Sequence, residues 1–194
     1  MFCLADLGEG HFREIPLRDA IQDGTLLERA SRVWIHVDGI PGQETLSELG
    51  ERFGLHPLAL EDVAHAGERP KVDFYEDHMF TVLGLPERQD GELAVHQVSL
   101  FLGRKVLVSF QSGGPDPFVQ VRRRLCAPGT RVGARPLDFL FYILVDAVVD
   151  QGFPVLEGFG DALEDLEGDL LGEPDRELLD RLHGIRRDLL LLRR

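Results

Sequence analysis

Residues 93–111 decide the fold: they read LAVHQVSLFL (93–102), GRK (103–105) and VLVSFQ (106–111). The two longer runs are rich in β-branched and aromatic residues, and a three-residue linker that contains glycine is typical of a β-hairpin. A hairpin makes its two strands antiparallel, so the sheet that contains them is mixed and not purely parallel.

Upstream of this hairpin, strand-like runs alternate with helical ones. Strands are predicted at 2–7, 11–16, 33–37, and 72–75 leading on to 79–85, with a turn at 8–10 between the first two, and helices at 18–31, 43–53 and 56–64. Gly54 suits a left-handed cap after the second helix, and Pro57 favours the first turn of the third. Together these elements predict a mixed sheet of six or seven strands with helices on its faces.

The C-terminal part of the chain has a helical pattern. One helix is predicted at 116–126 and a longer one after residue 136, with a kink or break near 152–154, because Pro154 cannot donate a helical hydrogen bond and clashes with the preceding turn. Two apolar heptad seams follow, broken at 172–174, and predict an antiparallel helical hairpin. The first seam holds Leu156, Phe159, Leu163, Leu166 and Leu170, and the second holds Leu178, Leu182, Ile185, Leu189 and Leu192.

This change of pattern divides the chain in two. Residues 1–135 are predicted to form an α/β core, and residues 136–194 the C-terminal helices, including the projecting hairpin. A length of 194 residues suits one such core with an appendage, and not two ordinary domains.

The chain is acidic, with a net charge of −13 and a pI near 4.9, which argues against nucleic acid or anionic lipid as the main partner. Residues 146–180 carry twelve acidic residues and one arginine. Asp161, Glu164 and Asp165 lie opposite the apolar seam, and carboxylates are preferred ligands of hard cations such as Mg²⁺. This face is open to three interpretations: diffuse attraction of divalent cations, a basic partner, or a solvated surface.

The cysteine content and the apolar runs bear on the compartment. Cys3 and Cys126 are the only cysteines and fit a reducing cytoplasm. The start lacks a basic region followed by an apolar stretch, so no secretory signal is expected. The densest apolar run, 139–145, is far shorter than the ~20 residues that span a bilayer, so we expect this chain not to cross a membrane.

Motifs for nucleotide binding and acyl transfer are missing from the sequence. The most enzyme-like cluster comprises His56, Glu61, Asp62 and His65. His56 and His65 fall on opposite sides of an ideal helix, so capping and surface hydrogen bonds are the simpler interpretation, and a metal-dependent enzyme is the alternative. His36 and His96 lie in predicted strands, where we expect hydrogen-bonded sheet residues and not ligands.

Six motifs occur in a fixed order: WIHVDG (34–39), FGLHPLALED (53–62), RPKVDFY (69–75), QVSLFL (97–102), VLVSFQ (106–111) and DFLFYILVDAVVD (138–150). In this order and spacing they resemble the cytoplasmic domain of CorA-type divalent-cation transporters. The likeness covers the chain from about residue 30 to residue 194.

The resemblance implies an α/β/α sandwich with a seven-stranded mixed sheet, and it places the acidic hairpin beside a long stalk helix. It also implies a homopentamer at the cytoplasmic face of the membrane that moves Mg²⁺, Co²⁺ or Ni²⁺ and is not an enzyme, with regulatory cations between neighbouring domains. The stalk, two membrane helices and a Gly-Met-Asn loop would lie beyond Arg194. We therefore expect this chain to be soluble, a monomer or weak oligomer, and unable to conduct ions by itself.

In the same family, regulatory cations are held by the loop after the strand at 79–85. The corresponding loop here is 86–91, so the resemblance makes Glu87 and Asp90 the candidate ligands for Mg²⁺ or Co²⁺. The leading hypothesis is the cation-sensing domain of a CorA-like magnesium/cobalt transporter. The alternatives are the same domain of a zinc-transporting member of the superfamily, a free-standing soluble metal-binding enzyme, and an acidic interaction module.

Overall fold

A mixed β-sheet runs through the centre of the molecule. In the residues that the computed structural model describes, 1–8, 12–16, 25, 29–89, 91–170 and 176–193, the sheet has seven strands in the order β2-β1-β3-β7-β6-β5-β4. They are β1 (Phe2–Asp6), β2 (Arg13–Ile15), β3 (Arg32–Asp38), β4 (Lys71–Phe74), β5 (His78–Gln89), β6 (Glu92–Gly103) and β7 (Val106–Gln111). β3 and β7 are parallel and the other neighbouring pairs are antiparallel, which confirms the predicted mixed sheet.

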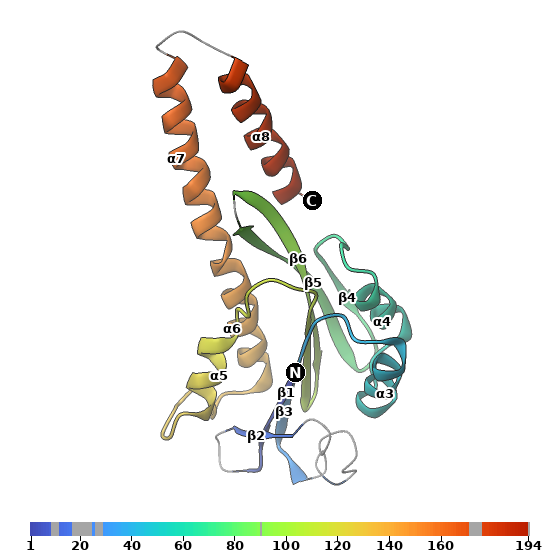
Figure 1. Cartoon of the computed structure of the whole chain (residues 1–194). Coiled ribbons are helices and arrows are strands. Elements are labelled where there is room, and N and C mark those ends of the chain that lie inside the picture. Colours follow the sequence, from blue (N-terminus) through green and yellow to red (C-terminus); the bar gives the residue numbers. More distant parts are fainter. Residues whose placement is uncertain (9–11, 17–24, 26–28, 90, 171–175, 194) are drawn as a thin grey trace.

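Helices cover both faces of this sheet and make three layers (Figure 1). One face carries α3 (Gln43–Phe53) and α4 (Pro57–Ala64), and the other carries α5 (Val119–Cys126) and α6 (Leu137–Asp150). The predicted α/β/α sandwich is therefore confirmed.

Each face of the sheet has its own apolar core. Leu49 of α3 packs in one cluster with Phe101 of β6, and Leu144 of α6 packs in the other with Trp34 of β3. All four side chains are almost fully buried. Burying a side chain of this size contributes about 1.5–3 kcal/mol, so these clusters hold the helices to the sheet.

The helices α3 and α4 begin and end close to where the sequence predicts. Gly54 has a φ of +68° and donates its N–H to the carbonyl of Gly50 at the end of α3. His56 caps α4 by accepting the N–H of Leu58 at its Nδ1 (3.3 Å), and Pro57 is the first helical residue. Local sequence signals therefore set these boundaries.

The ribbon formed by β5 and β6 is longer than predicted. Pairing continues as far as Gln89 opposite Glu92, so the predicted loop at 86–91 is wrong. Residues such as Pro86 and Glu87 have low strand propensity, but a partner strand overrides that preference. The ribbon therefore extends as two paired strands beyond the helices of the core.

Three other predictions fall on the first and last parts of the chain. The predicted helix at 18–31 and the turns at 8–10 and 172–174 lie largely or wholly outside the described residues.

The predicted helix at 116–126 is shorter than expected. It begins only at Val119, because a turn precedes it in which Asp116 Oδ1 accepts the N–H of Phe118 at 2.8 Å.

The C-terminal helices leave the core as a hairpin (Figure 1). α7 (Gly152–Leu170) follows α6 after a one-residue interruption at Gln151, near the position predicted from Pro154, although the backbone of Gln151 stays helical (φ −67°, ψ −19°). α8 (Arg176–Leu192) returns beside α7 toward the end of the β5–β6 ribbon. The predicted antiparallel arrangement is therefore present.

The apolar seam of this hairpin is only partly covered. Phe159 and Leu166 of α7 and Leu178 of α8 are buried. Other seam residues remain exposed, namely Leu156, Leu163, Leu170, Leu182 and Leu189. Two helices in contact cover only the residues that face each other, so part of each seam stays open to solvent.

Within the part of the chain that the structure describes, one helical stretch has the length and composition of a membrane span. α6 and α7 together, Leu137–Leu170, are long and apolar enough by that criterion, although Asp146 and Asp150 interrupt the apolar run. The sequence analysis counted only uninterrupted apolar residues, and its expectation that this chain does not cross a membrane stays a prediction. A single such helix is weak evidence for a membrane span, because core helices also meet the criterion.

Candidate cation-sensing site

Glu87, one of the two candidate ligands at the ribbon, contacts a histidine. Its Oε2 lies 3.1 Å from Nε2 of His96 on β6, and both side chains are about one-quarter exposed. The imidazole packs against Gly113 and Gly114, where a Cβ on Gly114 would come within 2.6 Å of the ring. Glu87 thus has a positioned partner that the sequence did not indicate. The other candidate, Asp90, lies outside the described residues.

The next residue of β5, Arg88, reaches the helical hairpin instead. Neighbouring residues of a strand point to opposite faces, so Arg88 lies on the other side of the ribbon from Glu87. Its Nη2 lies 3.3 Å from Oδ2 of Asp188 on α8, and its guanidinium lies 4.8 Å from the ring centre of Phe159 on α7. One side chain therefore contacts both helices of the hairpin.

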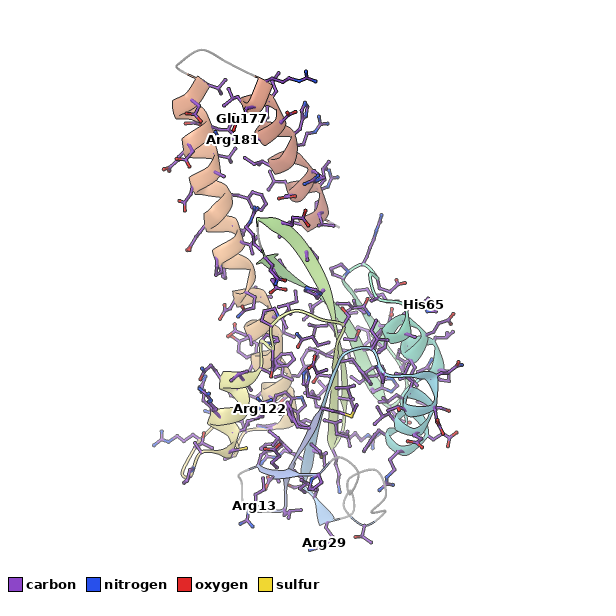
Figure 2. The ribbon with its side chains drawn as sticks, in the orientation of Figure 1. Arg13, Arg29, His65, Arg122, Glu177 and Arg181 are labelled. Atoms are coloured by element: carbon purple, nitrogen blue, oxygen red, sulfur yellow. The ribbon has the colours of Figure 1, made fainter. Side chains whose placement is uncertain are left out.

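The three acidic candidates on α7, Asp161, Glu164 and Asp165, are exposed to solvent. Near the outer end of the hairpin, Arg181 of α8 reaches across to Asp169 of α7 at 2.6 Å (Figure 2). Among the described residues, no group of three or more His, Cys, Asp or Glu side chains is placed to hold a metal ion. Diffuse attraction of cations therefore stays a prediction for this acidic face.

The four residues of the enzyme-like cluster do not converge. Asp62 binds Nζ of Lys71 at 2.8 Å, and this hydrogen bond raises the pKa of the lysine. Nδ1 of His65 donates to the backbone carbonyl of Glu61 at 2.9 Å, and the histidine lies at the outer end of α4 (Figure 2). His56 is occupied in capping α4. These contacts agree with the simpler interpretation of capping and surface hydrogen bonds.

A stack of three rings, which the sequence did not indicate, joins α4 to β5. Tyr75 lies between His56 and His78, with ring centres 4.3 and 4.9 Å away. Nε2 of His78 accepts the backbone N–H of His56 at 3.5 Å. Burial lowers the pKa of His78, and the nearby His56 lowers it further. Each imidazole therefore accepts a backbone N–H at the start of α4, His78 from His56 and His56 from Leu58.

His36 is a buried sheet residue, as expected. Its Nδ1 lies 2.9 Å from Oγ of Ser109, which also accepts the indole N–H of Trp34 at 3.0 Å. Burial lowers the pKa of His36 to about 4. The histidine is therefore neutral near pH 7, with one ring nitrogen engaged in the sheet.

Known proteins share both the sequence pattern and the fold. Residues 29–194 match the model of the CorA-like Mg²⁺ transporter protein family. The chain belongs to this family. Over 185 residues it is 35% identical to the cobalt/magnesium transport protein CorA of Thermotoga maritima, a match that covers 94% of this chain and 53% of that protein. Over 150 residues it is 23% identical to the CorA protein of Methanocaldococcus jannaschii, covering 77% and 47% of the two chains. The chain thus spans about half the length of these curated relatives.

Solved CorA structures have the same fold. The complete CorA magnesium transporter from Methanocaldococcus jannaschii matches with a TM-score of 0.78 and 21% identity, over 99% of this chain and 58% of that one. The cytoplasmic domain of ZntB from Vibrio parahaemolyticus matches with a TM-score of 0.70 and 11% identity, over 100% and 73% of the two chains. At these identities the likeness concerns the fold. These comparisons confirm the resemblance to CorA that the six motifs indicated. The family to which the chain belongs is a family of transporters.

Proposed function

We propose that this chain is the cytoplasmic cation-sensing domain of a CorA-type magnesium/cobalt transporter. The observation that carries the proposal is the extent of the family match, which continues through α7 and α8 to residue 194. The hairpin is thus part of what the family shares, and not an unrelated appendage. In this proposal residues 1–135 are the core, and residues 136–194 carry the signal toward the membrane.

The proposed mechanism is electrostatic. α7 exposes Asp161, Glu164 and Asp165, and such carboxylates repel their counterparts on neighbouring domains of a homopentamer. Mg²⁺ or Co²⁺ relieves that repulsion and favours the packed arrangement. An ion that binds more tightly to one arrangement than to the other shifts the equilibrium between them, and so biases a distant pore.

Glu87 and Asp90 remain proposed ligands of an inter-domain cation. Because Glu87 is hydrogen-bonded to His96, it would have to exchange that partner for the ion. The cost of this exchange favours weak binding of the ion.

The exposed leucines of α7 support contact with a further helix. Leu156, Leu163 and Leu170 lie seven residues apart and are 41–54% exposed, so they form a strip along one side of the hairpin. Apolar residues at heptad spacing are typical of helix-on-helix packing. In the proposed transporter, the stalk helix covers this strip on the cytoplasmic side of the membrane.

A zinc-transporting relative is the second candidate. It is favoured by the match to the cytoplasmic domain of ZntB, whose fold this chain shares along its whole length. The transported ion is selected in the pore, so uptake measurements with Zn²⁺, Co²⁺ and Mg²⁺ separate the two candidates.

The test starts with the DNA that flanks the codons of this chain. We expect two apolar segments of about 20 residues with Gly-Met-Asn between them. Cells that express the complete reading frame should take up Co²⁺, and uptake should fall as internal Mg²⁺ rises. Replacing Asp161, Glu164 and Asp165 by Asn or Gln should weaken that inhibition.

The matched control neutralises three exposed acids of α3, Glu44, Glu48 and Glu51, and should leave inhibition by Mg²⁺ unchanged. A reading frame without membrane segments, or one that supports no uptake of any divalent cation, would contradict the proposed function. Equal effects of the two triple variants would contradict the role of α7.

A further inference from the structure

A groove lies between the C-terminal half of α8 and the start of β6, where α8 returns to the end of the β5–β6 ribbon (Figure 1). Its volume is about 630 Å³, which is within the range of small-molecule sites, roughly 300–1,000 Å³. Its walls combine basic and apolar side chains, namely His183, Arg186 and Arg187, and Leu93, Leu190 and Leu191. The groove therefore offers positive charge and an apolar surface side by side.

The three basic residues share one face of α8. Arg186 and Arg187 follow His183 by three and four residues, and residues at this spacing are neighbours on a helix surface. A helix face turned toward a sheet normally carries apolar side chains. The helix dipole favours basic residues only in the last turn, and α8 continues to Leu192. Neither packing nor the dipole therefore accounts for basic residues at these positions.

The carboxylates of the groove do not compensate both arginines. Asp188 already has a cationic partner in Arg88, whose Nη2 lies 3.3 Å from its Oδ2. Arg187 reaches the other oxygen of Asp188 only at 3.8 Å, and its side chain is 79% exposed. Within the described part of the chain, Arg186 has no ion-pair partner, and Glu92 is the second carboxylate that lines the groove. The groove is therefore a locally basic site in a chain whose net charge is −13.

We propose that this groove binds a small molecule with phosphate groups, of the nucleoside polyphosphate class. A guanidinium donates paired hydrogen bonds to phosphate oxygens, and Arg186 and Arg187 supply two such groups. Leu93, Leu190 and Leu191 supply an apolar surface for the nucleoside. Such a site needs no glycine-rich loop, because side chains and not backbone N–H groups hold the phosphates. This binding is additional to the proposed sensing of cations and does not depend on it.

The experiment measures the heat of binding when this chain is titrated with ATP, inorganic tripolyphosphate or adenosine, each without divalent cations. We expect ATP to bind most tightly, because it contacts both the arginines and the leucines of the groove. Tripolyphosphate should bind more weakly, and adenosine more weakly still. The Arg186→Gln/Arg187→Gln double variant should bind ATP at least about tenfold more weakly, since each charge-assisted hydrogen bond contributes roughly that factor to affinity.

The matched control is Arg176→Gln/Arg181→Gln, which removes the same charge from the outer part of the same helix (Figure 2). It should change the affinity for ATP less than about twofold. Glu92→Gln removes a carboxylate from the groove and should strengthen ATP binding about two- to threefold, whereas Glu177→Gln, outside the groove, should not. Circular dichroism on each variant establishes that α8 remains helical.

Absence of binding by both ATP and tripolyphosphate would overturn the proposal. Equal losses in the two double variants would also overturn it, because binding would then depend on the charge of the helix and not on the groove. Equal affinities for ATP and tripolyphosphate would overturn the role of the leucines and leave a site for inorganic polyphosphate. Self-association of the chain that disappears in Arg186→Gln/Arg187→Gln would reject a small ligand, because an acidic helix of a second copy would then occupy the groove. None of these results requires transport, so they are independent of the uptake experiment.

Discussion

His36 loses its contacts with water when β3 enters the sheet, and burial lowers its pKa from 6.5 to about 4. The unfolded chain then takes up a proton at a higher pH than the folded chain. The free energy of unfolding should therefore have its full value above pH 6.5 and should decrease by roughly 3 kcal/mol as the pH falls toward 4.

Urea unfolding at a series of pH values checks this expectation. In His36→Asn, the amide can donate to Ser109 but does not titrate. The decrease in unfolding free energy between pH 6.5 and 4 should therefore be smaller in this variant. An unfolding free energy that varies equally with pH in both proteins would show that His36 is not the group responsible.

Gln97 is a second buried polar residue whose loss should be costly. Its Oε1 accepts the N–H groups of Gly67 and Glu68 at 2.9 and 3.0 Å, and its Nε2 donates to the carbonyl of Asp62 at 2.8 Å. Gln97→Leu leaves these groups without their partner, so we expect a loss of about 2–4 kcal/mol in unfolding free energy. Gln89→Leu, at an exposed position, is the control and should change it little. Similar losses in both variants would contradict this role.

The loop that follows β7 contains a glycine, Gly114, whose replacement by alanine should destabilise the protein. Gly114 has a φ of +81°, and a Cβ there would meet the ring of His96 at 2.6 Å, whereas Gly129 has a φ of +71° and nothing within 4 Å. Gly114→Ala should therefore destabilise the protein by about 1–3 kcal/mol more than Gly129→Ala, which suffers backbone strain alone. Thermal unfolding of the two variants compares these costs. Equal shifts would mean that the ring moves aside freely.

The elements themselves were predictable to different degrees. The ends of α3 and α4 follow from Gly54 and Pro57, because a cap depends on residues within one turn of it. The extension of β5 through Glu87 and Arg88 was not predictable, because pairing with β6 outweighs the weak strand propensity of these residues. The seam of α7 predicted the hairpin, but its pattern shows only which residues are apolar and not how much of them α8 covers.

For the whole molecule, we expect weak Mg²⁺ binding. The chain has a net charge of −13, and its described residues bring no group of three metal-ligating side chains together. Isothermal titration should therefore show weak heats, without a stoichiometric endpoint, that decrease when NaCl screens the carboxylates. Neutralising Asp161, Glu164 and Asp165 should reduce them further. A tight site with one ion per chain would contradict the proposed diffuse mechanism.

The sequence by itself determined the mixed sheet, the caps of α3 and α4, the interruption before α7 and the membership of the CorA family. Each of these is carried by residues close together in the chain, or by motifs in a fixed order. Only the tertiary structure decided that Glu87 contacts His96 and that Arg88 contacts Asp188, one hundred positions away. Such contacts depend on which strands are neighbours and on how the hairpin docks. Those are properties of the packed chain, and no local pattern of residue types encodes them.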